Sequence, residues 1–304
     1  MQNSGLGNAV NPLLSLTDPL VFGIPALLLI GWRGEPGLKD EPQHLKQGRV
    51  TLPLLETLGL DYALLPDIDE EVLNTISTAV EQMHSSSSPF ALIAGKDSFA
   101  AYRSPAVQNE PYPLTREEAL SIVLSCLDSS GPVVSTTGKL SREIYEYREK
   151  TGQGHRRDFL NIGSMGHASQ IALAIALNKP DRTVYCLDGD GAVLMHMGAL
   201  AIIGTSRAPN FKHIVFNNNA HDSVGGQPTV GFEVDLPGAA KACGYTLTLR
   251  AASREEIKAA LAALNSGPGP GLLEIRLKKG AHPDLGRPKT DPRENKTAFM
   301  EFLS

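Results

Sequence analysis

The residues best suited to chemistry are two glycines and an aspartate that follow a predicted strand. Thr183–Leu187 is apolar and reads as a buried strand, and Asp188-Gly189-Asp190-Gly191 comes directly after it. The glycines let a phosphate approach the backbone, and the amides that follow can bind it. Asp190 stands at a strand end, where ligands of α/β proteins usually bind. Its carboxylate is the hard oxygen ligand that Mg²⁺ takes when it bridges protein and phosphate.

A second polar cluster, Asn217-Asn218-Asn219, follows the predicted strand Lys212–Phe216. Asn218 lies 28 positions after Asp190, which is room for one helix and a return strand. The two strand ends can therefore be neighbours at one sheet edge, where these side chains would form a Mg²⁺ site holding a diphosphate. The alternative is two ordinary strand–helix turns, in which Gly, Asn and Asp are common.

The elements that would position these residues alternate between strands and helices, as in a parallel sheet covered by helices. In the first third of the chain, strands are predicted at Ala26–Ile30, Tyr62–Leu65 and Phe90–Ala94, and helices at Leu52–Leu58 and Asp69–His84. Residues 99–113 contain three prolines and are predicted to link this part to a second α/β unit.

The second unit is predicted to begin with a helix that Thr115 and Glu118 cap and that runs to about Cys126. Strands are expected at Pro132–Ser135, Thr183–Leu187, Lys212–Phe216 and Gly271–Leu277. Further helices are expected at Lys139–Lys150, Gly166–Ala176, Leu194–Thr205, Leu236–Cys243 and Arg254–Asn265. From Lys278 the tail is polar and rich in proline.

Composition excludes several classes of function. The 304 residues carry 28 Lys and Arg against 33 Asp and Glu, so there is no basic field for nucleic acid or an anionic membrane. Three widely spaced cysteines argue against a disulfide framework, and the longest apolar run, residues 24–30, is too short to span a bilayer. The N-terminus has no signal-peptide pattern. We expect a soluble cytoplasmic α/β protein with neither a nucleic-acid nor a membrane partner.

Together, Gly-Asp-Gly and the Asn-Asn just under thirty residues later match the signature of thiamine-diphosphate enzymes. Further matching segments span nearly the whole chain: Gly31–Gly37, Lys39–His44, Ser135–Lys139, Gly163–Ala168 and Asn217–Thr229. On these segments the chain resembles the phosphonopyruvate decarboxylases, and the sulfopyruvate decarboxylases share much of the pattern. The resemblance implies a thiamine-diphosphate-binding fold of two parallel-sheet α/β domains. Residues 1–98 would be an incomplete pyrimidine-binding domain, and residues 114–304 a diphosphate-binding domain.

The resemblance also implies roles for individual residues. Asp190, Asn218 and the Ala220 carbonyl would bind Mg²⁺. The cofactor thiamine diphosphate would be bound by Gly163, Ser164, Met165, Gly189, Gly191 and Ala192, with Asn3, Ser4 and Gly5 near the active site. Gly191 and Ala192 would offer amides to the diphosphate, Gly163 a carbonyl to the aminopyrimidine, and Met165 a wedge beneath the cofactor; the alternative for Met165 is an ordinary core methionine. Asn219 stands where a glycine is more usual, but asparagine tolerates a left-handed backbone.

Four side chains are candidates for the substrate's anionic groups and for catalysis: Arg33, Lys39, His44 and His221. A 2-oxo acid that carries a second anion needs cationic donors. Arg33 and Lys39 can equally be solvated loop charges. His221 lies three residues after Asn218, beside the expected metal, whereas His213, on an apolar strand, is expected to be a core histidine.

The activating glutamate of the family lies upstream of the segment that matches Met1–Gly5, so we expect this chain to lack it. Glu35 and Glu41 lie downstream and cannot replace it by position. The incomplete sheet should also expose an edge and apolar surface. Three interpretations remain: a truncated gene model, a missing half supplied by a separate chain, or a catalytically inactive cofactor-binding remnant.

The leading hypothesis is therefore Mg²⁺- and thiamine-diphosphate-dependent decarboxylation of a small anionic 2-oxo acid, 3-phosphonopyruvate, to phosphonoacetaldehyde and CO₂ in phosphonate biosynthesis. The same-class alternative is a sulfopyruvate decarboxylase. Because the family places its cofactor between domains of different subunits, we also expect a homo-oligomer, a dimer or larger.

Overall fold

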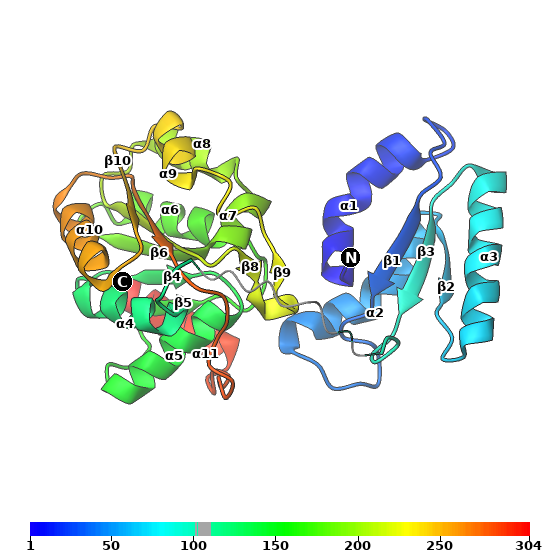
Figure 1. Cartoon of the computed structure of the whole chain (residues 1–304), viewed down its shortest axis with the longest axis horizontal. Coiled ribbons are helices and arrows are strands. Elements are labelled where there is room, and N and C mark those ends of the chain that lie inside the picture. Colours follow the sequence, from blue (N-terminus) through cyan, green and yellow to red (C-terminus); the bar gives the residue numbers. More distant parts are fainter. Residues whose placement is uncertain (101, 103–110) are drawn as a thin grey trace. The chain divides into compact units, whose positions relative to one another are not determined.

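The structure is a computed structural model that describes residues 1–100, 102 and 111–304. The chain divides into two compact units, Met1–Pro105 and Ala106–Ser304, and each has its own parallel sheet (Figure 1). Most of the predicted linker, residues 101 and 103–110, lies outside the described residues. The expected fold class, α/β with two parallel-sheet units, is confirmed.

The first unit contains a three-stranded sheet in the order β1-β3-β2. Its helical elements are η1 (Asn3–Gly5), α1 (Leu6–Pro12), η2 (Leu13–Thr17), α2 (Pro42–Thr57) and α3 (Asp69–Ser86). Its strands are β1 (Leu27–Gly31), β2 (Asp61–Leu64) and β3 (Phe90–Ala94).

The predicted start of α2 at Leu52 is wrong, because the helix begins ten residues earlier, at Pro42. Proline suits the first helical turn, where its missing N–H has no intrahelical partner. Gly48 does not break the helix but lets it pass very close to the preceding loop. A methyl group at Gly48 would lie 1.7 Å from the Gly34 carbonyl oxygen.

Two small apolar cores hold this unit together, one on each face of the sheet. In Figure 1, α1 and α2 cover one face, where Leu6 and Leu55 pack with Ile30 and Ile93. On the other face α3 packs through residues such as Met83. β1 lies at the edge of the sheet. Exposed apolar residues on and around β1 include Ile24, Leu27 and Leu29, as expected for an open edge.

The second unit contains a six-stranded parallel sheet in the order β10-β11-β7-β6-β4-β5 and a small β8–β9 hairpin. Its strands are β4 (Val133–Ser135), β5 (Asp158–Leu160), β6 (Val184–Gly189), β7 (Phe211–Asn217), β8 (Ala220–His221), β9 (Gln227–Pro228), β10 (Leu247–Ala251) and β11 (Gly271–Arg276). Its helices are α4 (Arg116–Cys126), α5 (Lys139–Thr151), α6 (Ala168–Asn178), α7 (Asp190–Met195), α8 (Ala199–Ser206), η3 (Asp222–Val224), α9 (Leu236–Ala242), α10 (Arg254–Ser266) and α11 (Pro292–Leu303).

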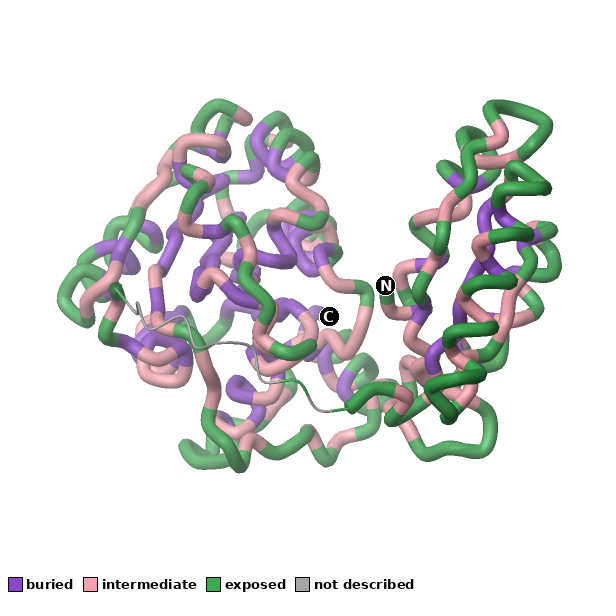
Figure 2. The backbone as a smooth tube through the Cα atoms, turned by 45° about the vertical axis from the view of Figure 1, so that its right-hand side comes forward, coloured by how far each residue is buried: buried purple, intermediate pink, exposed green. Residues whose placement is uncertain are grey.

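Both faces of this sheet are buried, which explains why its strands read as unbroken apolar runs. Along β6, Tyr185 and Leu187 enter the core formed with α4, α5 and α10. Val184 and Cys186 point to the opposite core, formed with α6, α8, α9 and α11. Figure 2 shows buried backbone following the strands of each unit. Among the described residues, no helix is long and apolar enough to cross a membrane.

The capping box predicted at the start of α4 is confirmed, because Thr115 and Glu118 bond reciprocally. The single helix predicted at Leu194–Thr205 is wrong: α7 ends at Met195 and α8 starts at Ala199. His196 leaves helical geometry between them. In this unit β5, β8, β9, β10, η3 and α11 were not predicted. The helix α11 nevertheless carries a signal, a capping box between Asp291 and Glu294 within the proline-rich tail.

Candidate functional site

The carboxyl ends of β4 and β6 form the point at which the strand order of the large sheet reverses. The chain adds β5 outside β4 and β7 outside β6, so the connecting loops leave in opposite directions. Ligands of open α/β sheets bind in the crevice at such a point. β6 pairs with β7 up to Gly189 and Phe216. The prediction that the Gly-Asp-Gly and Asn-Asn-Asn strand ends are neighbours is therefore confirmed.

Asp190 is the first residue of α7 and is 2% exposed. Burial raises the pKa of its carboxyl group, while hydrogen bonds from the Thr229 hydroxyl and from backbone amides act in the opposite direction. Among the described residues no Lys or Arg forms an ion pair with it, and of the charged side chains only His221 acts to lower its pKa. A buried carboxylate without a cationic partner is costly unless it coordinates a metal ion. The environment of Asp190 therefore suits a cation.

Thr229 connects this carboxylate to the second strand end. Its hydroxyl donates to Asp190 and contacts Asn219 Oδ1 at 3.3 Å, while Gly231 N donates to that hydroxyl at 3.0 Å. Gly231 has no room for a side chain, since a methyl group there would lie 2.6 Å from both Asp190 Oδ2 and Asn217 Oδ1. Asn219 has a φ of 56°, the left-handed backbone expected for it. The loop after β7 therefore packs directly onto the Gly-Asp-Gly turn.

Gly191 brings two further predicted residues together. A methyl group at Gly191 would lie 2.7 Å from Cε1 and Nδ1 of His221 and 3.2 Å from Cε of Met165. Both side chains are half-buried. His221, Met165 and the Gly-Asp-Gly turn therefore form one surface, although they are far apart in the sequence.

The other predicted cofactor contacts of this unit line the same region. Gly189 precedes α7, and its amide donates to Asp188 Oδ1 at 3.0 Å. Ala192 is buried, and its carbonyl oxygen would lie 3.0 Å from a methyl group at Gly166. The turn at residues 163–165 therefore packs beside the first turn of α7. Within that turn Ser164 is exposed and has a φ of 49°, which bends the backbone sharply, and the Gly163 amide contacts Asn161.

The remaining predicted site residues belong to the first unit. Asn3 is buried there and donates to the Arg33 carbonyl (2.8 Å) and to the Thr51 hydroxyl (2.9 Å), so it ties the N-terminus to α2. Ser4 is exposed and Gly5 is half-buried beside it. Asn3 thus has a structural role in this unit, and the cofactor role of all three stays a prediction.

Arg33, Lys39 and His44 lie on the loop before α2 and its first turn. The Arg33 guanidinium forms a two-point ion pair with Asp40, whose carboxylate also accepts from Gly34 N at 2.7 Å. This pairing holds the pKa of Asp40 at about 2. Lys39 is exposed, and His44 Nδ1 contacts Gln47 at 3.3 Å. Two of the Arg33 guanidinium nitrogens are therefore already bound to Asp40. The assignment of Arg33, Lys39 and His44 to substrate binding stays a prediction.

Two polar groups to which the sequence motifs assigned no role lie beside the second-unit site, although Thr136 falls within the matching segment Ser135–Lys139. Thr136 follows β4, is 6% exposed, and its hydroxyl has no hydrogen-bond partner among the described residues. His196 follows α7, and its Nε2 is also buried without a partner there. Its ring contacts Gly166, where a methyl group would lie 2.3 Å from Cδ2. Only the packing of the loops reveals these groups.

A buried polar cluster lies beneath the Gly-Asp-Gly turn. Cys186, Asp188 and His213 place possible ligand atoms within 4.8 Å of one another. Burial raises the pKa of the Cys186 thiol, which favours the protonated form rather than a metal ligand. His213 contacts Asp188 Oδ2 (3.4 Å) and the Tyr245 hydroxyl (3.3 Å). The expectation of a core histidine at this position is confirmed.

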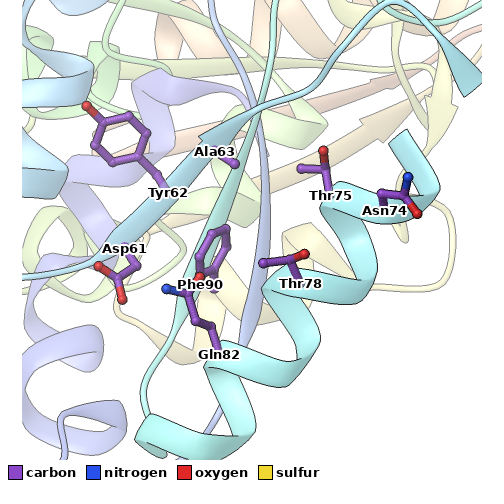
Figure 3. Close-up of a pocket in the computed structure, with 8 residues that line it drawn as sticks. All are labelled: Asp61, Tyr62, Ala63, Asn74, Thr75, Thr78, Gln82 and Phe90. Carbon is purple, nitrogen blue, oxygen red and sulfur yellow. The ribbon is translucent and has the colours of Figure 1, made fainter. Parts of the chain in front are cut away.

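A separate hollow of about 390 Å³ lies between β2 and α3 of the first unit (Figure 3). It is lined by Asp61, Tyr62, Ala63, Asn74, Thr75, Thr78, Gln82 and Phe90. None of the predicted site residues belongs to this set. The residues that predict chemistry therefore do not gather at this hollow.

The residues at the switch point fit a metal-bound diphosphate. A buried carboxylate without a paired cation, an asparagine and a backbone carbonyl are the oxygen donors that Mg²⁺ prefers. The unpartnered Thr136 hydroxyl can donate to an anion, and Gly191 has no side chain to displace His221 and Met165 from the turn. The chemistry of the donors thus agrees with the cofactor that the sequence predicts.

Comparisons with known proteins agree with the cofactor that the sequence predicts. The family described as "Thiamine pyrophosphate enzyme, C-terminal TPP binding domain" matches residues 136–275. Phosphonopyruvate decarboxylases from Streptomyces viridochromogenes and Streptomyces hygroscopicus are each 37% identical over all of this chain, and the alignments cover 78% and 77% of those proteins. A sulfopyruvate decarboxylase from Methanosarcina acetivorans is 29% identical over all of this chain and 81% of that protein.

Proposed function

Because this chain belongs to the phosphonopyruvate decarboxylase family and is a carbon–carbon lyase, we propose that it releases CO₂ from 3-phosphonopyruvate and forms phosphonoacetaldehyde. We place this reaction in phosphonate biosynthesis. The observation that carries the proposal is the buried Asp190, which lies at the switch point without a paired Lys or Arg among the described residues. The 37% identity over the whole chain supports the choice of substrate.

The proposal includes thiamine diphosphate and Mg²⁺. Asp190, Asn218 and the Ala220 carbonyl would hold the metal ion, and the amides of Gly191 and Ala192 would contact the diphosphate. When bound, the cofactor supplies an electron sink for the pair of electrons that remains when CO₂ leaves. These groups lie on one sheet edge, which lets the fold fix them before the substrate arrives.

The chain's own side chains would orient the reactants and move protons. His221 lies against Gly191, next to the expected metal, so its imidazole can donate a hydrogen bond or a proton to a group bound there. Met165, on the other side of Gly191, offers an apolar surface that keeps water away from the reacting group. The remaining anionic group of the substrate would be bound by cationic side chains, for which Arg33, Lys39 and His44 stay the candidates.

Release of CO₂ by the purified chain tests this function. The protein is supplied with thiamine diphosphate and Mg²⁺, and 3-phosphonopyruvate and sulfopyruvate are compared in parallel. We expect turnover of phosphonopyruvate, which would show that another group replaces the activating glutamate that this chain is expected to lack. The Asp190→Ala variant should show no turnover and should also lose Mg²⁺-dependent cofactor binding. The matched control is Asp181→Ala, because Asp181 is exposed at the opposite end of β6.

Each result of this assay has a distinct meaning. Preferential turnover of sulfopyruvate would replace the proposed substrate, an outcome that the 29% identity to a sulfopyruvate decarboxylase makes worth measuring. Cofactor binding without turnover of either acid would contradict the enzymatic proposal for this chain and would mean that it is either incomplete without the activating glutamate or an inactive cofactor-binding protein. Unchanged cofactor affinity in Asp190→Ala would overturn the metal assignment.

A further inference from the structure

The orientation of the Asn218 side-chain amide decides whether this residue can serve a metal ion. Its two ends have similar shapes, but only the oxygen is a ligand, whereas the NH₂ group is a donor. Asn218 is 5% exposed, so bulk water does not set this orientation. The groups around Asn218 must therefore fix which end faces the metal.

Asp222 contacts one end of this amide. Asn218 Nδ2 donates to Asp222 Oδ2 at 2.6 Å. An ionised carboxylate can only accept hydrogen bonds, so it must face the NH₂ group. At the other end, the Ala220 amide donates to Asn218 Oδ1 at 3.2 Å. A flipped amide would place its oxygen against the Asp222 carboxylate and its NH₂ group against the Ala220 N–H, so both hydrogen bonds would be lost. In the observed orientation the carbonyl oxygen keeps a second lone pair for another ligand.

Asp222 is itself held in place. Its side chain is 5% exposed, and Oδ2 also accepts from Arg116 Nη1 (3.3 Å) and Gly280 N (3.1 Å). The buried Arg116 is fixed by a two-point ion pair with Glu143, at 2.7 and 2.9 Å. Arg116 of α4 and Gly280 of the loop after β11 thus donate to the same carboxylate oxygen as Asn218, and α5 contributes only through the grip of Glu143 on Arg116. This network would prevent Asp222 from following a rotation of Asn218.

We propose that Asp222 is a positioning residue that turns the Asn218 carbonyl oxygen toward the metal of a bound diphosphate. This inference rests on the proposed function, since it concerns the same site. It assigns Asp222 no contact with metal, cofactor or substrate. Partners of this kind, behind a metal ligand, typically change metal affinity by about 10–100-fold when they are removed.

Three substitutions separate orientation from charge. Asp222→Leu removes the acceptor while keeping similar bulk, and Asp222→Ala removes it with less bulk. Asp222→Asn removes the negative charge but keeps an oxygen that can accept from Asn218 and Arg116. Asp235→Leu is the matched control, because Asp235 forms an exposed ion pair with Arg250. Arg116 keeps Glu143 in every variant, so we expect all four proteins to fold, and circular dichroism checks this.

The readout is thiamine-diphosphate binding, measured by calorimetry over a series of Mg²⁺ concentrations, with CO₂ release measured in parallel. We expect cofactor binding by Asp222→Leu and Asp222→Ala to require at least about 10-fold more Mg²⁺ than binding by the wild type, and we expect excess Mg²⁺ to restore their activity. Asp222→Asn and Asp235→Leu should resemble the wild type. Because a purely structural defect would not be corrected by metal, restoration by Mg²⁺ identifies positioning.

Two outcomes would overturn the inference alone: an unchanged Mg²⁺ requirement in Asp222→Leu and Asp222→Ala, or an equal loss in Asp222→Asn, which would assign the effect to charge. If one of Asp222→Leu and Asp222→Ala unfolds, the other still tests the loss of the acceptor against Asp222→Asn and the wild type. Failure of the wild type to bind thiamine diphosphate with Mg²⁺ would be a different result. It would remove the proposed function and the inference with it.

Discussion

Replacing Gly191 with alanine should damage the site much more than the fold. The new methyl group would lie 2.7 Å from two ring atoms of His221 and 3.2 Å from Cε of Met165. Ordinary carbon contacts are about 3.5–4.0 Å, so the imidazole must retreat by about 1 Å. Both obstructing groups are the outer parts of rotatable side chains, so they can move without disturbing the backbone. We therefore expect a stability loss near the lower end of the roughly 1–3 kcal/mol typical of overpacking.

The functional cost should be larger, because a misplacement of about 1 Å at a reacting centre can lower the rate about 100-fold. We expect kcat for CO₂ release to fall by about this factor, while the melting temperature changes little. Steady-state kinetics at saturating thiamine diphosphate and Mg²⁺, with thermal unfolding of the same sample, measures both effects. Gly198→Ala is the control, because a methyl group there meets no atom within 4 Å. Wild-type turnover by a folded Gly191→Ala protein would refute the argument that His221 and Met165 act at this position.

Two predictions concern stability. Asp40 has a folded-state pKa of about 2, below its ordinary 3.8, because Arg33 binds the ionised carboxylate. Its contribution to the free energy of unfolding is therefore present above about pH 4 and is lost as the pH falls toward 2. The melting temperature of Asp40→Asn should therefore lie below that of the wild type at neutral pH and approach it in acid, and a constant difference across this range would contradict the assignment. Arg148→Met should destabilise the protein by about 3–5 kcal/mol, since it leaves Asp158 buried and unpaired. Adding Asp158→Leu should recover much of that loss in urea unfolding, and no recovery would show that the cost comes from packing instead.

Local chemistry in the sequence was enough to predict many of the elements. The capping box of α4 and the bounds of β3 were predicted residue for residue, because caps and short apolar runs act over a few neighbouring residues. The sequence also placed two polar strand ends side by side, since a spacing of one helix and one strand in an α/β chain leads to a neighbouring parallel strand. The start of α2 was predicted ten residues too late, and in the missed part Gly48 packs against the Gly34 carbonyl, a contact between distant residues that the local sequence does not reveal.

The sequence by itself therefore determined the α/β class, the Gly-Asp-Gly and Asn-Asn-Asn strand ends and the family to which they belong. Only the tertiary structure decided which groups surround them. The contacts of Asp190 with Thr229 and of Asn218 with Asp222, and the unpartnered hydroxyl of Thr136, depend on how separate loops fold over one sheet edge. The orientation of an amide and the solvation of a buried carboxylate are properties of such three-dimensional surroundings. The spacing of residues along a chain brings side chains near one another, but it does not fix which of their atoms face each other.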